Sequence, residues 1–116
     1  MTPLETAELS VKACLNKKAT DIKLLEVTEL TTIADYYLIC TAGSAPQMKA
    51  IYEEVDRIMS ANGIEPLHVE GVGTSGWVLL DYGTVVIHIF TREVREFYSL
   101  ERLWADAKSV DIDNIK

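Results

Sequence analysis

Few residues in this chain of 116 are of the types that perform acid–base or nucleophilic chemistry. His68 and His88 are the only histidines, and both fall in segments that read as strands. Ser44 and Ser75 lie outside any nucleophile elbow or Ser-His-Asp arrangement. No HxH, HExxH or CxxC motif accompanies the histidines, so the spacing favours neither a metal site nor a cofactor. The sequence therefore predicts a protein that is not an enzyme.

One pattern keeps an enzymatic alternative open. Nucleotidyl transfer uses a Gly-Ser turn followed by two carboxylates, two residues apart on a strand, that hold metal ions. Here Gly43 and Ser44 precede Glu54 and Asp56, but the apolar periodicity places both acids in a helix. Side chains two residues apart on a helix point about 200° apart and do not converge on one metal. A capped turn followed by a solvated helix face is the preferred interpretation.

The charge balance indicates the class of partner. The net charge is −7 and the isoelectric point is about 4.7. Nucleic-acid affinity rests on Lys and Arg neutralising phosphates, so this surface disfavours a direct dependence on nucleic acid. A basic protein would be attracted to it.

Two cysteines, Cys14 and Cys40, lie in apolar runs, as expected of buried free thiols in a reducing compartment. No apolar run approaches the ~20 residues that cross a bilayer, so no membrane association is expected. The chain also opens without a signal-peptide pattern. A cytoplasmic location is therefore predicted, with an organelle as the alternative if a transit peptide has been removed.

The apolar patterning predicts a small α/β domain with a mixed sheet of about five strands and flanking helices. A first helix, capped by Thr2, ends near Ala19, and a second follows the cap Ser44 and ends at Gly63. Strands are expected at 22–27, 36–41 (central) and 67–70, the last completing a strand–helix–strand unit. A single domain spans residues 1–108, and a polar, frayed tail spans 109–116.

Residues 77–90 read as a β-hairpin whose two faces differ. A two-residue turn at Tyr82-Gly83 would pair Trp77 with His88. One face is then purely aliphatic and is expected to meet the core helices: Val78, Leu80, Val85, Ile87, Ile89. The other face has the mixed composition of an interface core: Trp77, Leu79, Val86, His88, Phe90. Alternatively, final helices at 91–98 and 100–107 cover this second face, fully or in part.

An ordered set of motifs from Lys18 to Asp106 resembles the ribosomal silencing factor family, also called the Iojap family. The motifs are DI at 21–22, ADYYLI at 34–39, TAGS at 41–44, EG at 70–71, WVLLDYG at 77–83, VIHIF at 86–90 and REFYSLERLW at 95–104. Each motif alone is weak, whereas the ordered set is highly specific. The N-terminal helix is the least family-specific part.

The resemblance implies a fold similar to nucleotidyltransferases, without their catalytic acids. It also implies a cytoplasmic homodimer that binds the large ribosomal subunit through its fourteenth protein. Bound there, the protein would block joining of the small subunit and repress translation under nutrient limitation. The alternatives are a nucleotidyltransferase-like enzyme and a dimeric adaptor without a ribosome role.

Partner-binding residues are expected within 77–104. Trp77 and Trp104 would be apolar anchors, while Asp81 and Glu101 would face basic side chains of the partner. The full set of expected contact residues is Trp77, Leu79, Asp81, His88, Tyr98, Leu100, Glu101 and Trp104.

Overall fold

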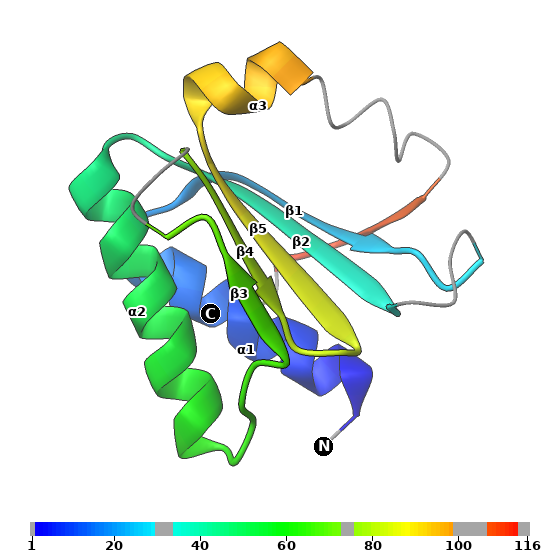
Figure 1. Cartoon of the computed structure of the whole chain (residues 1–116). Helices are drawn as coiled ribbons and strands as arrows, with labels where there is room; N and C mark the ends of the chain where they lie inside the picture. The colour runs from blue at the N-terminus through cyan, green and yellow to red at the C-terminus, as the bar shows by residue number, and fades with distance from the viewer. Residues whose placement is uncertain (1, 30–33, 73–75, 99–106, 114–116) are drawn as a thin grey trace.

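The computed structural model describes residues 2–29, 34–72, 76–98 and 107–113. In this part of the chain, six strands form one mixed sheet in the order β3-β4-β5-β2-β1-β6. The helices α1 and α2 lie side by side on one face of the sheet (Figure 1). The predicted α/β class is therefore confirmed, with one strand more than expected.

The first helix, α1 (Pro3–Asn16), begins as its sequence predicts. The Thr2 hydroxyl accepts a hydrogen bond from the Glu5 backbone N–H, and the Glu5 carboxylate accepts one from the Thr2 N–H, completing a capping box. The helix ends before the expected Ala19 because Lys18 adopts a left-handed φ of 61°, which α-helical geometry does not accommodate.

The second helix, α2 (Ala45–Ala61), is capped by the Ser44 hydroxyl, which accepts from the Gln47 N–H. After its C-cap at Asn62, Gly63 takes a φ of 75°, the left-handed conformation that commonly ends helices. The apolar stripe predicted from the sequence meets the sheet, since Met48, Ile51 and Met59 are all buried.

The centre of the sheet is a parallel pair formed by β2 (Tyr36–Ala42) and β5 (Val85–Thr91). Outside β2 lies β1 (Thr20–Glu26), and outside β5 lies β4 (Trp77–Asp81), each antiparallel to its neighbour. The edge strand β3 (His68–Glu70) pairs with β4. It therefore runs in the same direction as β2, as the predicted strand–helix–strand unit requires, although β4 and β5 lie between them.

The hairpin register differs from the prediction by two residues. Trp77 pairs with Phe90 rather than with His88, and Asp81 pairs with Val86. A tight two-residue turn of type I′ or II′ at Tyr82-Gly83 needs a positive φ at Tyr82. Among the described non-glycine residues, only Lys18 and Asp21 have positive φ. An even shift keeps every side chain on its face, so the predicted division into two faces holds.

The polar segment at the C-terminal end is also more ordered than expected. Residues Lys108–Val110 form β6, which pairs with Leu24, Leu25 and Glu26 of β1, whereas the sequence suggested a frayed tail here. Lys108 and Ser109 are exposed, so β6 is held by backbone pairing at a sheet edge, which apolar patterning does not reveal.

The main core lies between the sheet and the two long helices. It contains the whole aliphatic face of the hairpin, together with Val11 and Cys14 of α1 and Ile51 of α2. A second, smaller cluster lies on the opposite face of the sheet, around Leu25, Ile39 and Phe90. Within the described ranges, no helix is long and apolar enough to cross a membrane.

Candidate docking face

The sheet face opposite α1 and α2 carries four rings linked by neighbouring contacts, hereafter the aromatic cluster: Tyr37, Trp77, His88 and Phe90. The Trp77 ring centroid lies 5.0 Å from that of Phe90 and 6.0 Å from that of His88. The Tyr37 ring meets His88 edge-on at 5.4 Å, and His88 stacks nearly parallel to Phe90 at 6.0 Å. These separations lie within or near the range in which ring pairs attract one another.

His88 fixes the orientation of the Trp77 indole. The Trp77 Nε1–H donates a hydrogen bond to His88 Nδ1 at 3.3 Å, which requires Nδ1 to be unprotonated. The imidazole is 5% exposed, and burial lowers the pKa of His88 to about 4. The ring is therefore neutral at physiological pH and serves as an acceptor for Trp77.

Exposure divides the face into a floor and a surface layer. Phe90, Val86 and His88 are buried, whereas Tyr37, Trp77 and Leu79 are half-buried. The floor of this face is thus buried and its β4 row is partly accessible, while the contact role expected for the row stays a prediction. Trp77, Leu79 and Asp81 alternate along β4 and therefore form one row on this face.

Asp81 at the end of this row is half-buried and helps to shape the hairpin loop. Its Oδ1 accepts a hydrogen bond from the Gly83 backbone N–H at 2.8 Å. Gly83 has a φ of 86°, a conformation that favours glycine. Because a carboxylate has several acceptor positions, Asp81 retains capacity for a basic partner while holding the loop.

The other expected contact residues lie towards the C-terminal end. Tyr98 is the last residue of α3 (Arg92–Tyr98), the helix that follows β5 and confirms the expected helix at 91–98 (Figure 1). Leu100, Glu101 and Trp104, and the helix expected at 100–107 apart from Ala107, fall outside the described residues.

Arg95 anchors α3 to the sheet, a role that the sequence did not suggest. Its side chain is 7% exposed, and Nη1 donates to the Asp21 carbonyl and to the Thr41 hydroxyl, each at 2.7 Å. The register of β1 is irregular between Thr20 and Lys23, and Asp21 has a φ of 48°. On the same helix, Arg92 forms an ion pair with the Asp21 carboxylate at 3.4 Å.

Tyr37 is the member of the aromatic cluster that sequence reasoning missed. Residues 36–41 read as a nearly all-apolar central strand, so no face was assigned to them. The alternation of side chains along β2 was the available signal, because Tyr37 and Ile39 share a face and Ile39 is the register partner of His88.

The two acids of the enzymatic alternative do lie on a helix, α2, as the periodicity predicted. Glu54, however, is buried rather than solvated. Its carboxylate accepts hydrogen bonds from Arg57 Nε at 2.9 Å and from Asn16 Nδ2 at 3.0 Å. The hydrogen bonds from Arg57 and Asn16 lower the pKa of Glu54 to about 2. This carboxylate links α1 to α2 and belongs to the helix interface.

The two thiols meet inside the main core. Cys14 on α1 and Cys40 on β2 are fully buried, and their Sγ atoms are 3.9 Å apart. The hydrogen bond with Cys40, together with burial, raises the pKa of the Cys14 thiol. The expectation of buried free thiols is confirmed.

Comparison with known proteins places these features in a family. The model of the family described as ribosomal silencing factor during starvation matches residues 1–116. A ribosomal silencing factor of Halalkalibacterium halodurans is 37% identical over 99% of this chain and 98% of its own length. One of Bacillus subtilis is 40% identical over 91% of this chain and 90% of its own.

A solved structure agrees with this assignment. The crystal structure of a protein from Chromobacterium violaceum superposes with a TM-score of 0.88 at 30% identity, covering 99% of this chain and 96% of that one. The names of the relatives describe a regulatory role at the ribosome. The chain belongs to the ribosomal silencing factor family.

Proposed function

We propose that this protein represses translation by binding the fourteenth protein of the large ribosomal subunit and thereby blocking joining of the small subunit. The observation that carries the proposal is the row Trp77, Leu79 and Asp81, half-buried on the sheet face that neither α1 nor α2 covers. The family name supports the ribosome as the target.

The aromatic cluster supplies a preorganised anchor. Trp77 is held by its hydrogen bond to His88 and by contact with Phe90, so little side-chain freedom is lost when a partner covers it. Tryptophan is among the residues most often found at the energetic centre of interfaces. His88 contributes from beneath, by positioning the indole.

Charge favours a basic partner. The chain carries a net charge of −7, and Asp81 stands at the end of the apolar row. Opposite charge accelerates encounter and sets orientation, whereas the same surface repels the phosphates of ribosomal RNA. We therefore assign Asp81 and Glu101 to contacts with basic side chains, and Tyr98, Leu100 and Trp104 to further apolar contacts with the partner.

Silencing then requires only occupancy. A protein bound at the surface where the subunits meet excludes the small subunit sterically, and no chemical step is involved. In this proposal the free protein is a cytoplasmic homodimer. The large subunit then competes with the second copy of the protein for binding.

Sedimentation of purified subunits tests this function. We expect the wild-type protein to co-sediment with large subunits. When small subunits are added, it should reduce the peak of joined subunits. Trp77→Ala should weaken binding by about thirtyfold, because truncating a central anchor costs ~2 kcal/mol. The matched control is Leu67→Ala, an apolar residue that is 76% exposed beside β3 and outside the row.

Two results would contradict the proposal. Unchanged subunit joining at saturating protein would exclude anti-association, leaving the dimeric adaptor as the alternative. Full co-sedimentation of a folded Trp77→Ala variant would remove the β4 row from the docking surface.

A further inference from the structure

A pocket of about 620 Å³ opens on the helix side of the sheet, on the face opposite the aromatic cluster. It lies between the beginning of α2 and the segments flanking β4. Its described lining residues are Ala45, Pro46, Met48, Lys49, Tyr52, Gly71, Val72, Gly76, Val78 and Thr91. A cavity of this volume is in the range that holds small organic ligands.

The walls of the pocket are mainly apolar. Met48 and Val78 are buried and belong to the main core, and the half-buried Tyr52 packs against that core. Val72 contributes from the other side and is 44% exposed. A flat ring or short chain would find thioether, aromatic and aliphatic contacts here, with the Thr91 hydroxyl as a nearby polar group.

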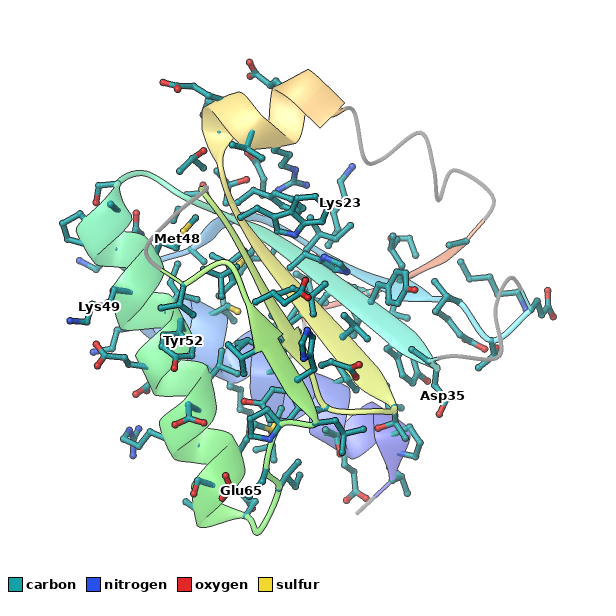
Figure 2. The ribbon with its side chains drawn as sticks, in the orientation of Figure 1. Lys23, Asp35, Met48, Lys49, Tyr52 and Glu65 are labelled. Carbon is teal, nitrogen blue, oxygen red and sulfur yellow. The ribbon has the colours of Figure 1, made fainter. Side chains whose placement is uncertain are left out.

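The charged group in the described lining is basic, in a protein whose net charge is −7. Among the described lining residues none is acidic, and Lys49 is the one with a permanent charge. Lys49 is exposed and makes no ion pair with any other described residue. Figure 2 shows Met48 between α2 and the strands and Lys49 on the outer side of the helix, and both residues line the pocket.

The beginning of α2 adds to this field. Ala45 and Pro46 are the first residues of the helix and line the pocket, and the first turn contains no acidic residue. The N-terminal end of a helix carries a partial positive charge, which favours a nearby anion.

We propose that this pocket binds a small amphipathic organic anion, with its apolar body between Met48, Tyr52 and Val72 and its anionic group at the rim near Lys49. The site is separate from the docking face and goes beyond the proposed ribosome binding. An apolar lining alone would also accept a neutral molecule. The positive charge of Lys49 is what favours an anion over a neutral molecule of the same shape.

The test uses 8-anilinonaphthalene-1-sulfonate as the anionic probe and N-phenyl-1-naphthylamine, which lacks the sulfonate, as the neutral probe. Both are titrated into the full-length protein and followed by fluorescence and by amide chemical shifts of the 13.0 kDa chain. We expect saturable binding of the sulfonate, with shifts concentrated at Met48, Tyr52, Val72 and Thr91.

Variants then measure separately how the apolar lining and the charge of Lys49 contribute to probe affinity. Ala45→Trp, at an exposed position of the opening, should reduce affinity for both probes at least tenfold by filling the pocket. Lys49→Gln should weaken the sulfonate about two- to fivefold, the effect of a partly exposed ion pair, and leave the neutral probe unchanged. Lys23→Gln, an exposed lysine of β1 labelled in Figure 2, is the matched control and should change neither.

A second variant protects the test if Ala45→Trp fails to fold. Val72→Asp places a carboxylate in the exposed part of the lining and should repel the sulfonate while retaining the neutral probe.

Three outcomes would overturn the proposal: no saturable sulfonate binding, shifts confined to the aromatic cluster, or loss of binding in Trp77→Ala but in none of the pocket variants. Each can occur whether or not the protein binds ribosomes, so failure here is distinct from failure of the proposed function.

Discussion

Trp77 and His88 are joined diagonally across neighbouring strands, since Trp77 pairs with Phe90 and His88 pairs with Leu79, yet the indole N–H reaches the imidazole Nδ1 at 3.3 Å. The half-buried anchor is thus oriented by a buried, neutral ring. This arrangement makes protonation of His88 costly, because a proton on Nδ1 removes the acceptor and places a charge in the core.

Protein stability should therefore decrease on mild acidification. The pKa of His88 is about 4 in the folded state and near 6.5 in the unfolded chain, so the unfolded chain binds the extra proton between these values. The contribution of neutral His88 is fully present above pH 6.5 and is lost as the pH falls towards 4, by up to about 3 kcal/mol. Urea unfolding at successive pH values measures this loss.

His88→Phe should remove this part of the pH dependence, while His68→Gln should retain it because His68 is exposed on β3. An unfolding free energy of the wild-type protein that is constant from pH 6.5 to 4 would show that His88 is not held neutral by burial.

Arg95 should stabilise the fold far more than its neighbour Arg92. Arg95→Met removes two charge-assisted hydrogen bonds, to Asp21 and Thr41, from a buried site, and we expect a loss of about 2–3 kcal/mol in unfolding free energy. Arg92→Met is the matched control, because its ion pair with Asp21 is largely exposed and should contribute under about 1 kcal/mol. Equal losses in the two variants would contradict the anchoring role.

Glu54 should stabilise the α1–α2 interface only while it is ionised. Its pKa is about 2 in the folded state, below the unfolded value near 4.5, so its contribution is present above pH 4.5 and disappears as the pH falls towards 2. Glu54→Gln should lower the melting temperature at pH 7, and the difference from wild type should shrink at acid pH.

The exposed neighbour Glu53 offers a control, because Glu53→Gln should leave the melting temperature unchanged at both pH values. A difference between Glu54→Gln and wild type that persists unchanged at pH 2 would mean that shape rather than charge holds the interface.

The sequence predicted the long helices and the division of the hairpin into two faces, because caps and apolar periodicity are local signals. Thr2, Ser44 and Gly63 each act where their residue types suggested. The hairpin register was wrong because it depends on the φ angle of Tyr82, which composition does not fix. The β6 strand was missed because Lys108 and Ser109 join the sheet through their backbone.

The candidate site was predicted less completely than the fold. Trp77 and Leu79 were identified from alternation alone, and their half-buried setting agrees with a contact role that stays a prediction. Glu54 was misjudged because helical spacing suggested a solvated face, and no pattern in the sequence indicated the buried role of Arg95. Their actual partners, Thr41 and Asn16, are distant in sequence, and only the tertiary fold brings them together.

The parallel pairing of β2 with β5 has a consequence for how the chain is made. Tyr36 pairs with Val85 and Ala42 with Thr91, so the central strand β2 is synthesised well before its parallel partner. Non-local pairings of this kind slow folding, because loop-closure entropy is lost before the contacts form. Until β5 is made, the apolar strand β2 can pair with β1 on one edge only. Destabilising changes in β5 should therefore appear first as low yield and aggregation.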